Sequence, residues 1–129
     1  MNLKQAVFAH LQGVAGAGDR IYPILLPQKP TLPAVTYQVI SDVPERDLAG
    51  TARRRARVQL SCWGATLAAA TDLAAAVAAR FQDLTGPMGT GGPEVLDSTT
   101  TIQADGFDDQ VGIYLVPVDA LILYRGGDT

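Results

Sequence analysis

The chain has few of the side chains on which enzyme chemistry depends. Its 129 residues include one cysteine and one histidine, and 18% of them are charged. Nucleophilic and acid–base catalysis need several such groups that converge, and a zinc site of cysteine and histidine needs more ligands than this chain supplies. Cys62 lies within an apolar alternation, which is typical of a small buried residue, and His10 is typical of an ordinary surface or boundary histidine. The sequence therefore predicts that the protein is no enzyme and holds no cofactor and no metal.

The chain also lacks an excess of positive charge and a long hydrophobic run. Its net charge is -3 and its sequence pI is about 4.9, so it does not carry the basic footprint of duplex-binding proteins. The longest apolar stretch, 113–124, is interrupted by Pro117 and Asp119 and falls short of the roughly 20 residues of a membrane-spanning helix. The first residues include Lys4 and His10 and lack the uninterrupted apolar core of a signal peptide. We expect a soluble protein that starts in the cytoplasm and contacts no membrane.

Two glycine-rich stretches and one acidic turn could suggest ligand sites. The glycines at 13–18 and 86–92 follow predicted helices and lack the Gly-Lys-Ser/Thr sequence of a phosphate-binding loop. Helix ends account for them, and a small nucleotide-binding domain is the alternative that they leave open. Asp105, Asp108 and Asp109 crowd one turn without the spacing or the final glutamate of a calcium loop, which favours a solvated turn.

Apolar periodicity divides the chain into helices and strands. Positions 56, 58, 60 and 62 are apolar and alternate with polar positions, which is typical of a strand with one buried face. Between 67 and 84 the apolar residues recur every three or four positions, which predicts a long amphipathic helix. The other predicted elements are a helix capped by Asn2 and ended by glycines from Gly13 onward, an extended piece at 20–23, strands at 34–41, 95–104 and 111–124, a loop at 42–51 and a hairpin turn at 105–109.

The order of these elements predicts a fold class. A helix, strands, a long helix and a hairpin indicate an α+β fold, namely a two-layer sandwich in which a mainly antiparallel sheet has two helices packed on one face. The length favours one core and a single domain over residues 1–129. Pro117 has no amide hydrogen for a β-ladder, so we expect the last strand to lie at a sheet edge or to contain a bulge.

Four arginines between positions 53 and 57 form the main concentration of charge, and two interpretations stay open. In the first, they lie on a solvated strand face and meet acids of the preceding loop. In the second, the loop and the start of the strand form an assembly arm that becomes ordered when a neighbouring subunit or partner supplies carboxylates. The candidate assembly interface comprises Asp42, Glu45, Arg46, Asp47, Arg53, Arg54, Arg55 and Arg57.

Four pieces of sequence, in order after the opening helix, resemble one known family. They are Arg-Ile-Tyr-Pro at 20–23, Leu-Pro-Gln at 26–28, Leu-Pro-Ala-Val-Thr-Tyr-Gln-Val-Ile-Ser at 32–41, and Arg-Val-Gln-Leu-Ser-Cys-Trp at 57–63, which leads into the alanine-rich helix. Together they are similar to the tail-terminator or tail-completion proteins of long-tailed phages, prophages and gene-transfer agents. These pieces are turn and strand signatures, and with the two helices the similarity covers nearly the whole length.

The resemblance implies a structural virion protein that forms a hexameric ring. Such a ring sits at the head-proximal end of the tail tube, stops tube polymerisation and joins the tail to the head. The implied partners are further copies of the chain, the tail-tube protein and a head-completion or connector protein, while DNA passes through the lumen without specific binding. The implied location is the virion tail, after synthesis in the bacterial host cytoplasm. A head–tail connector or a tail-tube subunit is the alternative within the same particle.

A ring subunit needs two different, complementary surfaces. The arginine-bearing loop and the expected sheet edge near Pro117 are the candidates for these surfaces.

Overall fold

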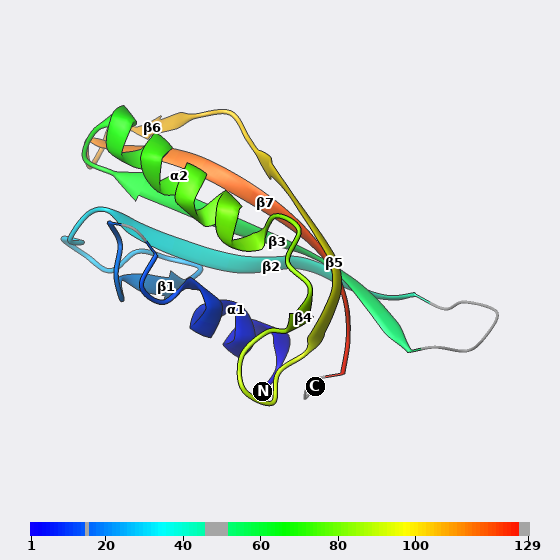
Figure 1. Ribbon diagram of the computed structural model, residues 1–129. Helices are drawn as coiled ribbons and strands as arrows, with labels where there is room; N and C mark the ends of the chain where they lie inside the picture. The colour runs from blue at the N-terminus through cyan, green and yellow to red at the C-terminus, as the bar shows by residue number, and fades with distance from the viewer. Residues whose placement is uncertain (15, 46–51, 127–129) are drawn as a thin grey trace.

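The computed structural model describes residues 1–14, 16–45 and 52–126. Two helices and seven strands make up this part of the chain (Figure 1). In chain order they are α1 (Leu3–Leu11), β1 (Ile21–Pro23), β2 (Ala34–Glu45), β3 (Arg53–Gly64), α2 (Leu67–Phe81), β4 (Gly86–Pro87), β5 (Glu94–Ile102), β6 (Gly106–Asp108) and β7 (Ile113–Arg125).

Both helices begin where the sequence supplies a capping side chain. The Asn2 side chain accepts a hydrogen bond from the Gln5 amide, and the Gln5 side chain accepts one from the Asn2 amide. The Thr66 hydroxyl accepts from the Ala69 amide at the start of α2. The predicted starts are thereby confirmed, whereas α2 ends at Phe81 rather than at position 84.

The strands form one sheet in the order β1-β2-β3-β7-β5-β4, and β6 also pairs with β7. β1 and β2 are parallel, and the other neighbours are antiparallel. The alternation predicted for β3 is confirmed, because Ala56, Val58, Leu60 and Cys62 are fully buried. Leu73, Val77 and Phe81 of α2 pack into the same core as these strand residues.

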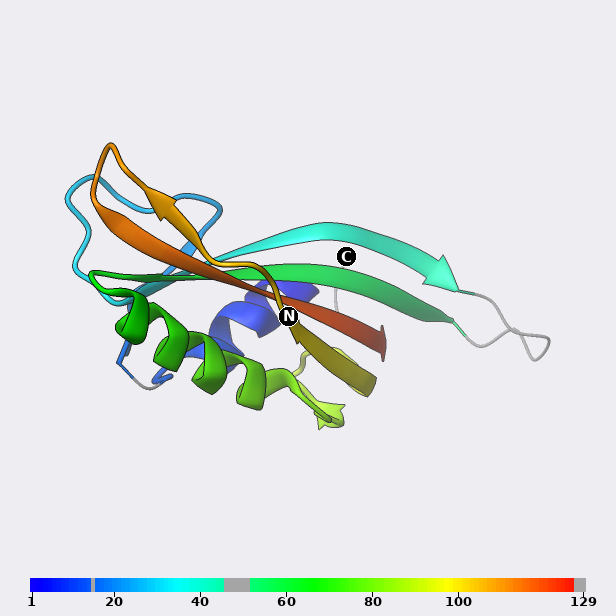
Figure 2. The same cartoon turned by 90° about the horizontal axis from the view of Figure 1, so that it is seen from above.

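The predicted two-layer sandwich with two helices packed on one face is wrong. The protein is mostly β, and its sheet curls into a half-barrel (Figures 1 and 2). Three strands are 12 or 13 residues long, and the twist of such strands accumulates into coiling. Register shifts between Val39 and Ser41 and between Val95 and Asp97 add local bends. The helices therefore follow a curved sheet, with α2 against β3, β7 and β5 and α1 against β1 and β2.

The position expected for the last strand is also wrong. β7 is central, with β3 on one side and β5 and β6 on the other. The Pro117 carbonyl accepts a hydrogen bond from the Gln103 amide, which lies just after the end of β5. Because the nitrogen and carbonyl of one strand residue point to the same side, the missing amide hydrogen of Pro117 falls at the break between β5 and β6. The proline is therefore tolerated inside the sheet.

Two predicted loops are shorter than expected. β2 continues to Glu45, so residues 42–45 of the predicted loop are strand. Residues 106–108 of the predicted hairpin turn form β6, and the turn lies further on, where the Gly112 amide donates to the Asp108 carbonyl. Gly112 has a φ of +70°, which favours glycine at this turn.

Candidate assembly surfaces

The end of β2 and the start of β3 extend away from both helices (Figures 1 and 2). We define the β2–β3 ribbon as residues 42–45 and 53–55, whose register pairs Glu45 with Arg53 and Val43 with Arg55. Most of the predicted interface residues lie in or beside this ribbon. Arg46 and Asp47 lie outside the described residues.

Asp42 connects the ribbon to the body of the sheet. Arg54 donates from Nε to Asp42 Oδ1 at 2.9 Å and from Nη2 to the Asp42 carbonyl at 3.0 Å. The Tyr124 hydroxyl of β7 donates to Asp42 Oδ2 at 2.6 Å. Burial, and then the hydrogen bond to the Asp42 carboxylate, raise the pKa of Tyr124 to about 12. Three strands thus meet at one carboxylate.

The other arginines on the exposed face have partners too. Arg55 pairs with Glu45 at 3.1 Å, and Arg57 pairs with Asp119 at 2.7 Å. The Gln103 side chain donates a further hydrogen bond of 3.2 Å to Asp119. The Asp119 side chain is buried near the centre of the sheet. The sequence around Asp119 did not reveal the Arg57–Asp119 ion pair, because the two residues lie 62 positions apart.

These contacts fit the interpretation in which the arginines meet acids of their own chain. Asp42 forms an ion pair with Arg54, and Glu45 forms one with Arg55, as that interpretation expects. Arg53 is partly buried at the start of β3. Whether the segment also serves as an assembly arm is not decided by these contacts, and the arm stays a prediction.

Exposed apolar side chains lie along two borders of the sheet, and sequence reasoning missed them. Ile40 on β2 is 42% exposed, and Ile102 at the end of β5 is 52% exposed. Phe107 on β6 and Ile24 after β1 are exposed as well. A period-two pattern could not reveal these residues, since their exposure depends on where neighbouring strands stop.

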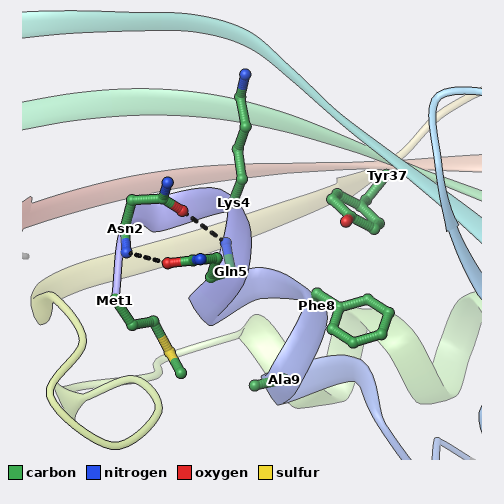
Figure 3. A pocket seen from close by; sticks show the side chains of 7 residues that line it. All are labelled: Met1, Asn2, Lys4, Gln5, Phe8, Ala9 and Tyr37. Carbon is green, nitrogen blue, oxygen red and sulfur yellow. Dashed lines mark hydrogen bonds between the residues drawn. The ribbon is translucent and has the colours of Figure 1, made fainter. Parts of the chain in front are cut away.

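A groove runs between α1 and β2 (Figure 3). Phe8 and Tyr37 form its apolar part, with their ring centroids 6.1 Å apart, and Lys4 projects from the helix nearby. An adjoining hollow is lined by Lys4, Tyr37, Gln38 and Val39, among others. Lys4 therefore stands beside the outer border of β2.

A second, more apolar groove lies at the other end of β2 and β3. Trp63 and the buried Ile113 line it, together with the exposed Leu25 and Val111. Trp63 is held by a 3.0 Å hydrogen bond from its indole nitrogen to the Thr36 hydroxyl.

The residues considered for chemistry lie apart from one another. Cys62 is fully buried, and burial raises its pKa to about 12. His10 is 2.7 Å from the Arg80 carbonyl through Nε2 and stands edge-on to Phe81, at the junction of the two helices. Within 1–14, 16–45 and 52–126, no three His, Cys, Asp or Glu side chains gather where they could hold a metal. In the same ranges, neither helix has the length and apolar character needed to cross a membrane.

Comparison with known proteins identifies the family. The family described as tail completion protein gp17 matches residues 5–123. No curated protein matches the sequence. A chain in the solved structure "Virion of native gene transfer agent (GTA) particle" has the same fold, with a TM-score of 0.76 and 16% identity over 96% of this chain and 95% of that one. The resemblance found in the sequence is thereby confirmed. The chain belongs to the tail completion protein gp17 family and is a structural tail protein of the kind found in bacteriophage and gene transfer agent particles.

Proposed function

We propose that this chain acts as a single unit over residues 1–129 that forms a closed ring, hexameric as the family resemblance implies. The ring terminates the tail tube at its head-proximal end and joins the tail to the head. Its partners are further copies of itself, the tail-tube protein and a head-completion or connector protein. The observation that carries the proposal is the family match over residues 5–123.

The shape of the protein supports a ring. A ring subunit needs two different surfaces that fit each other after a rotation. The curled sheet has β1 and β2 at one border and β5 with β4 and β6 at the other, so two unlike borders lie on opposite sides (Figure 2). The β2–β3 ribbon adds a projection that can reach a neighbour.

The charge supports passage of DNA without specific binding. A net charge of -3 gives no general attraction for a polyanion. The described arginines Arg54, Arg55 and Arg57 are already paired with carboxylates of the chain. A lumen built from such subunits lets DNA slide.

Tube termination tests this function directly. Purified tail-tube protein is allowed to polymerise with and without the chain, and tube lengths are measured by electron microscopy. We expect added chain to stop growth and to leave a cap at one end of each tube. Unchanged lengths together with bare ends contradict the proposal.

Three further observations would identify the alternatives. Long filaments made of the chain alone indicate a tail-tube subunit, and binding to the head connector without an effect on tubes indicates a head–tail connector. Thermal stabilisation by ATP or GTP would favour a nucleotide-binding domain instead.

A further inference from the structure

Charge is divided unevenly along the chain. Residues 81–124 contain no lysine or arginine but seven carboxylates, namely Asp83, Glu94, Asp97, Asp105, Asp108, Asp109 and Asp119. Residues 1–41 have the opposite excess, because Lys4, Arg20 and Lys29 outnumber their single carboxylate, Asp19. The net charge of -3 therefore combines an acidic part and a basic part of the sequence.

The fold places these two parts at opposite borders of the sheet. Residues 1–41 supply α1, β1 and most of β2, and β1 and β2 are the first two strands in the sheet order. Residues 81–124 supply β4, β5, β6 and most of β7, which lie on the other side of β3 (Figure 2). A contact between unlike borders of two copies therefore brings opposite charges together.

Most carboxylates of the acidic part form no ion pair within the described chain. Arg57 pairs with Asp119, and Arg125 pairs with Glu94, but the other five are exposed and have no cation partner among the described residues. One of these five, Asp108, lines a groove together with Lys29 of the same chain, so we leave both out. We define the acidic border as the four that remain beside β5 and β6: Asp83, Asp97, Asp105 and Asp109.

The cations that form no ion pair with a described carboxylate lie around α1. Lys4 is exposed on α1 and lines a hollow beside the edge of β2 (Figure 3). Arg20, just before β1, donates to backbone carbonyls, and Arg80 of α2 donates to carbonyls at the end of α1. Since carbonyls carry no formal charge, these positive charges are not neutralised. We define the basic border as Lys4, Arg20 and Arg80.

The two borders also lie at the same level along the strands. Tyr37 pairs with Leu60, Leu60 with Val118 and Val118 with Ile102, so Tyr37 and Ile102 are the two ends of one row across the sheet. Lys4 lines the hollow beside Tyr37, and the carboxylates at 97 and 105 stand on either side of Ile102. A rotation about an axis along the strands preserves this level.

Backbone pairing is not what these borders offer each other. β1 occupies the edge of β2 from Val35 to Tyr37. On the opposite border, β4 pairs with the start of β5, and the Gln82 side chain accepts a hydrogen bond from the Thr100 amide. At the level of the row, the borders therefore present side chains to a neighbouring copy.

We propose that neighbouring copies bind through charge, with the acidic border of one copy facing the basic border of the next. Because two acidic borders repel each other, as do two basic ones, the charges favour the repeating arrangement that closes a ring over a symmetric dimer. This inference rests on the ring of the proposed function and specifies the chemistry of its subunit contact.

Charge reversal tests the contact. The first variant carries Asp97→Lys, Asp105→Lys and Asp109→Lys, which makes its acidic border positive. The second carries Lys4→Glu, Ala9→Glu and Gln38→Glu, which makes its basic border negative. All six side chains are exposed, and circular dichroism verifies that both variants fold. At about 50 mM salt, where charges are weakly screened, each variant alone should cap about fivefold fewer tube ends than the wild type.

Mixing the two variants gives the sharpest readout. Both borders are positive in the first variant and negative in the second, so each variant accepts only the other as its neighbour. A hexamer can alternate the two, and an equimolar mixture should regain most of the wild-type capping. The control carries Asp72→Lys, Ala75→Lys and Ala79→Lys, which are exposed on α2, and should cap normally.

The outcomes separate the contact from the proposed function. Normal capping by each charge-reversed variant alone, a mixture that stays inactive, or an equal loss in the α2 control overturns the contact and leaves the proposed function standing. Wild-type capping should also weaken as salt rises to about 0.5 M, and capping that does not change contradicts the contact even if a variant fails to fold. Absence of any ring or cap from the wild-type chain overturns both.

Discussion

The Tyr124 hydroxyl and the Asp42 carboxylate tie the β2–β3 ribbon to the centre of the sheet, 2.6 Å apart. In the folded protein the pKa of Tyr124 is raised from 10.0 to about 12, so the hydroxyl keeps its proton to a higher pH than in the unfolded chain. Its contribution to stability is therefore complete below about pH 10 and is lost as the pH rises toward about 12.

Tyr124→Phe tests this contribution. We expect the variant to be less stable than the wild type by about 1–2 kcal/mol near pH 8, because one hydrogen bond to a carboxylate is lost. The free energy of unfolding, measured with urea, should also decline less steeply between pH 10 and pH 12 than in the wild type. Tyr22→Phe keeps the Tyr124 hydroxyl and is the control. Parallel pH profiles for Tyr124→Phe and the wild type would show that the Tyr124 hydroxyl does not carry the effect.

Cys62 should be inert in the folded protein. It is fully buried, and burial raises its pKa to about 12, so little thiolate forms and none of it is accessible. We expect a thiol reagent at pH 8 to label the denatured chain completely and the native chain at least a hundredfold more slowly. Rapid native labelling contradicts the burial of β3.

At the scale of elements, α2 holds the curled sheet together through its buried face. Val77 is fully buried against the strands, whereas Ala79 on the same helix is exposed. Val77→Asp places an unpaired carboxylate in the core and should cost about 4 kcal/mol or more, enough to unfold much of the protein. Ala79→Asp should cost less than about 1 kcal/mol. Circular dichroism and urea titration measure both, and a stable, folded Val77→Asp would show that the inward face is wrongly assigned.

The segment 42–54 gives the prediction for the ribbon. If it serves as an assembly arm, its amides should exchange hydrogen rapidly in the monomer and slowly in the ring, since contact with a neighbour restricts opening. Mass spectrometry of peptides from this segment, with peptides from α2 as the internal reference, measures the difference. Equal hydrogen exchange in the monomer and in the ring would contradict the hypothesis that this segment is an assembly arm.

The elements show what a sequence can predict. Strand β3 and helix α2 were predicted because each has one buried face and a clear period. β2 was cut short at Ser41 because Asp42 and Pro44 favour a turn, yet the ion pairs of Arg54 and Arg55 with Asp42 and Glu45 accompany pairing to the end of the strand. The local conformational preference of each residue does not reflect such contacts between strands.

The order of the strands in the sheet could not be predicted from the sequence. Pro117 correctly signalled a missing ladder hydrogen bond, but the gap between β5 and β6 that accommodates it depends on which strands are neighbours. The curl of the sheet has the same origin, because twist accumulates over strands whose order is set by tertiary structure.

At the scale of the whole molecule, the family resemblance correctly predicted a structural tail protein. The arginine-bearing interface was expected from a concentration of charge, and its described arginines Arg54, Arg55 and Arg57 turn out to have partners within the chain. The free borders around Ile40 and Ile102 follow only from the folded topology. A small protein with two unlike, unpaired borders is suited to repeat around an axis.

Cryo-electron microscopy of tail tubes mixed with the purified chain tests the central claim most directly. The account predicts one closed ring of identical subunits at one end of each tube. Tubes whose ends carry no additional density, beside a chain that stays monomeric at saturating concentration, would contradict it.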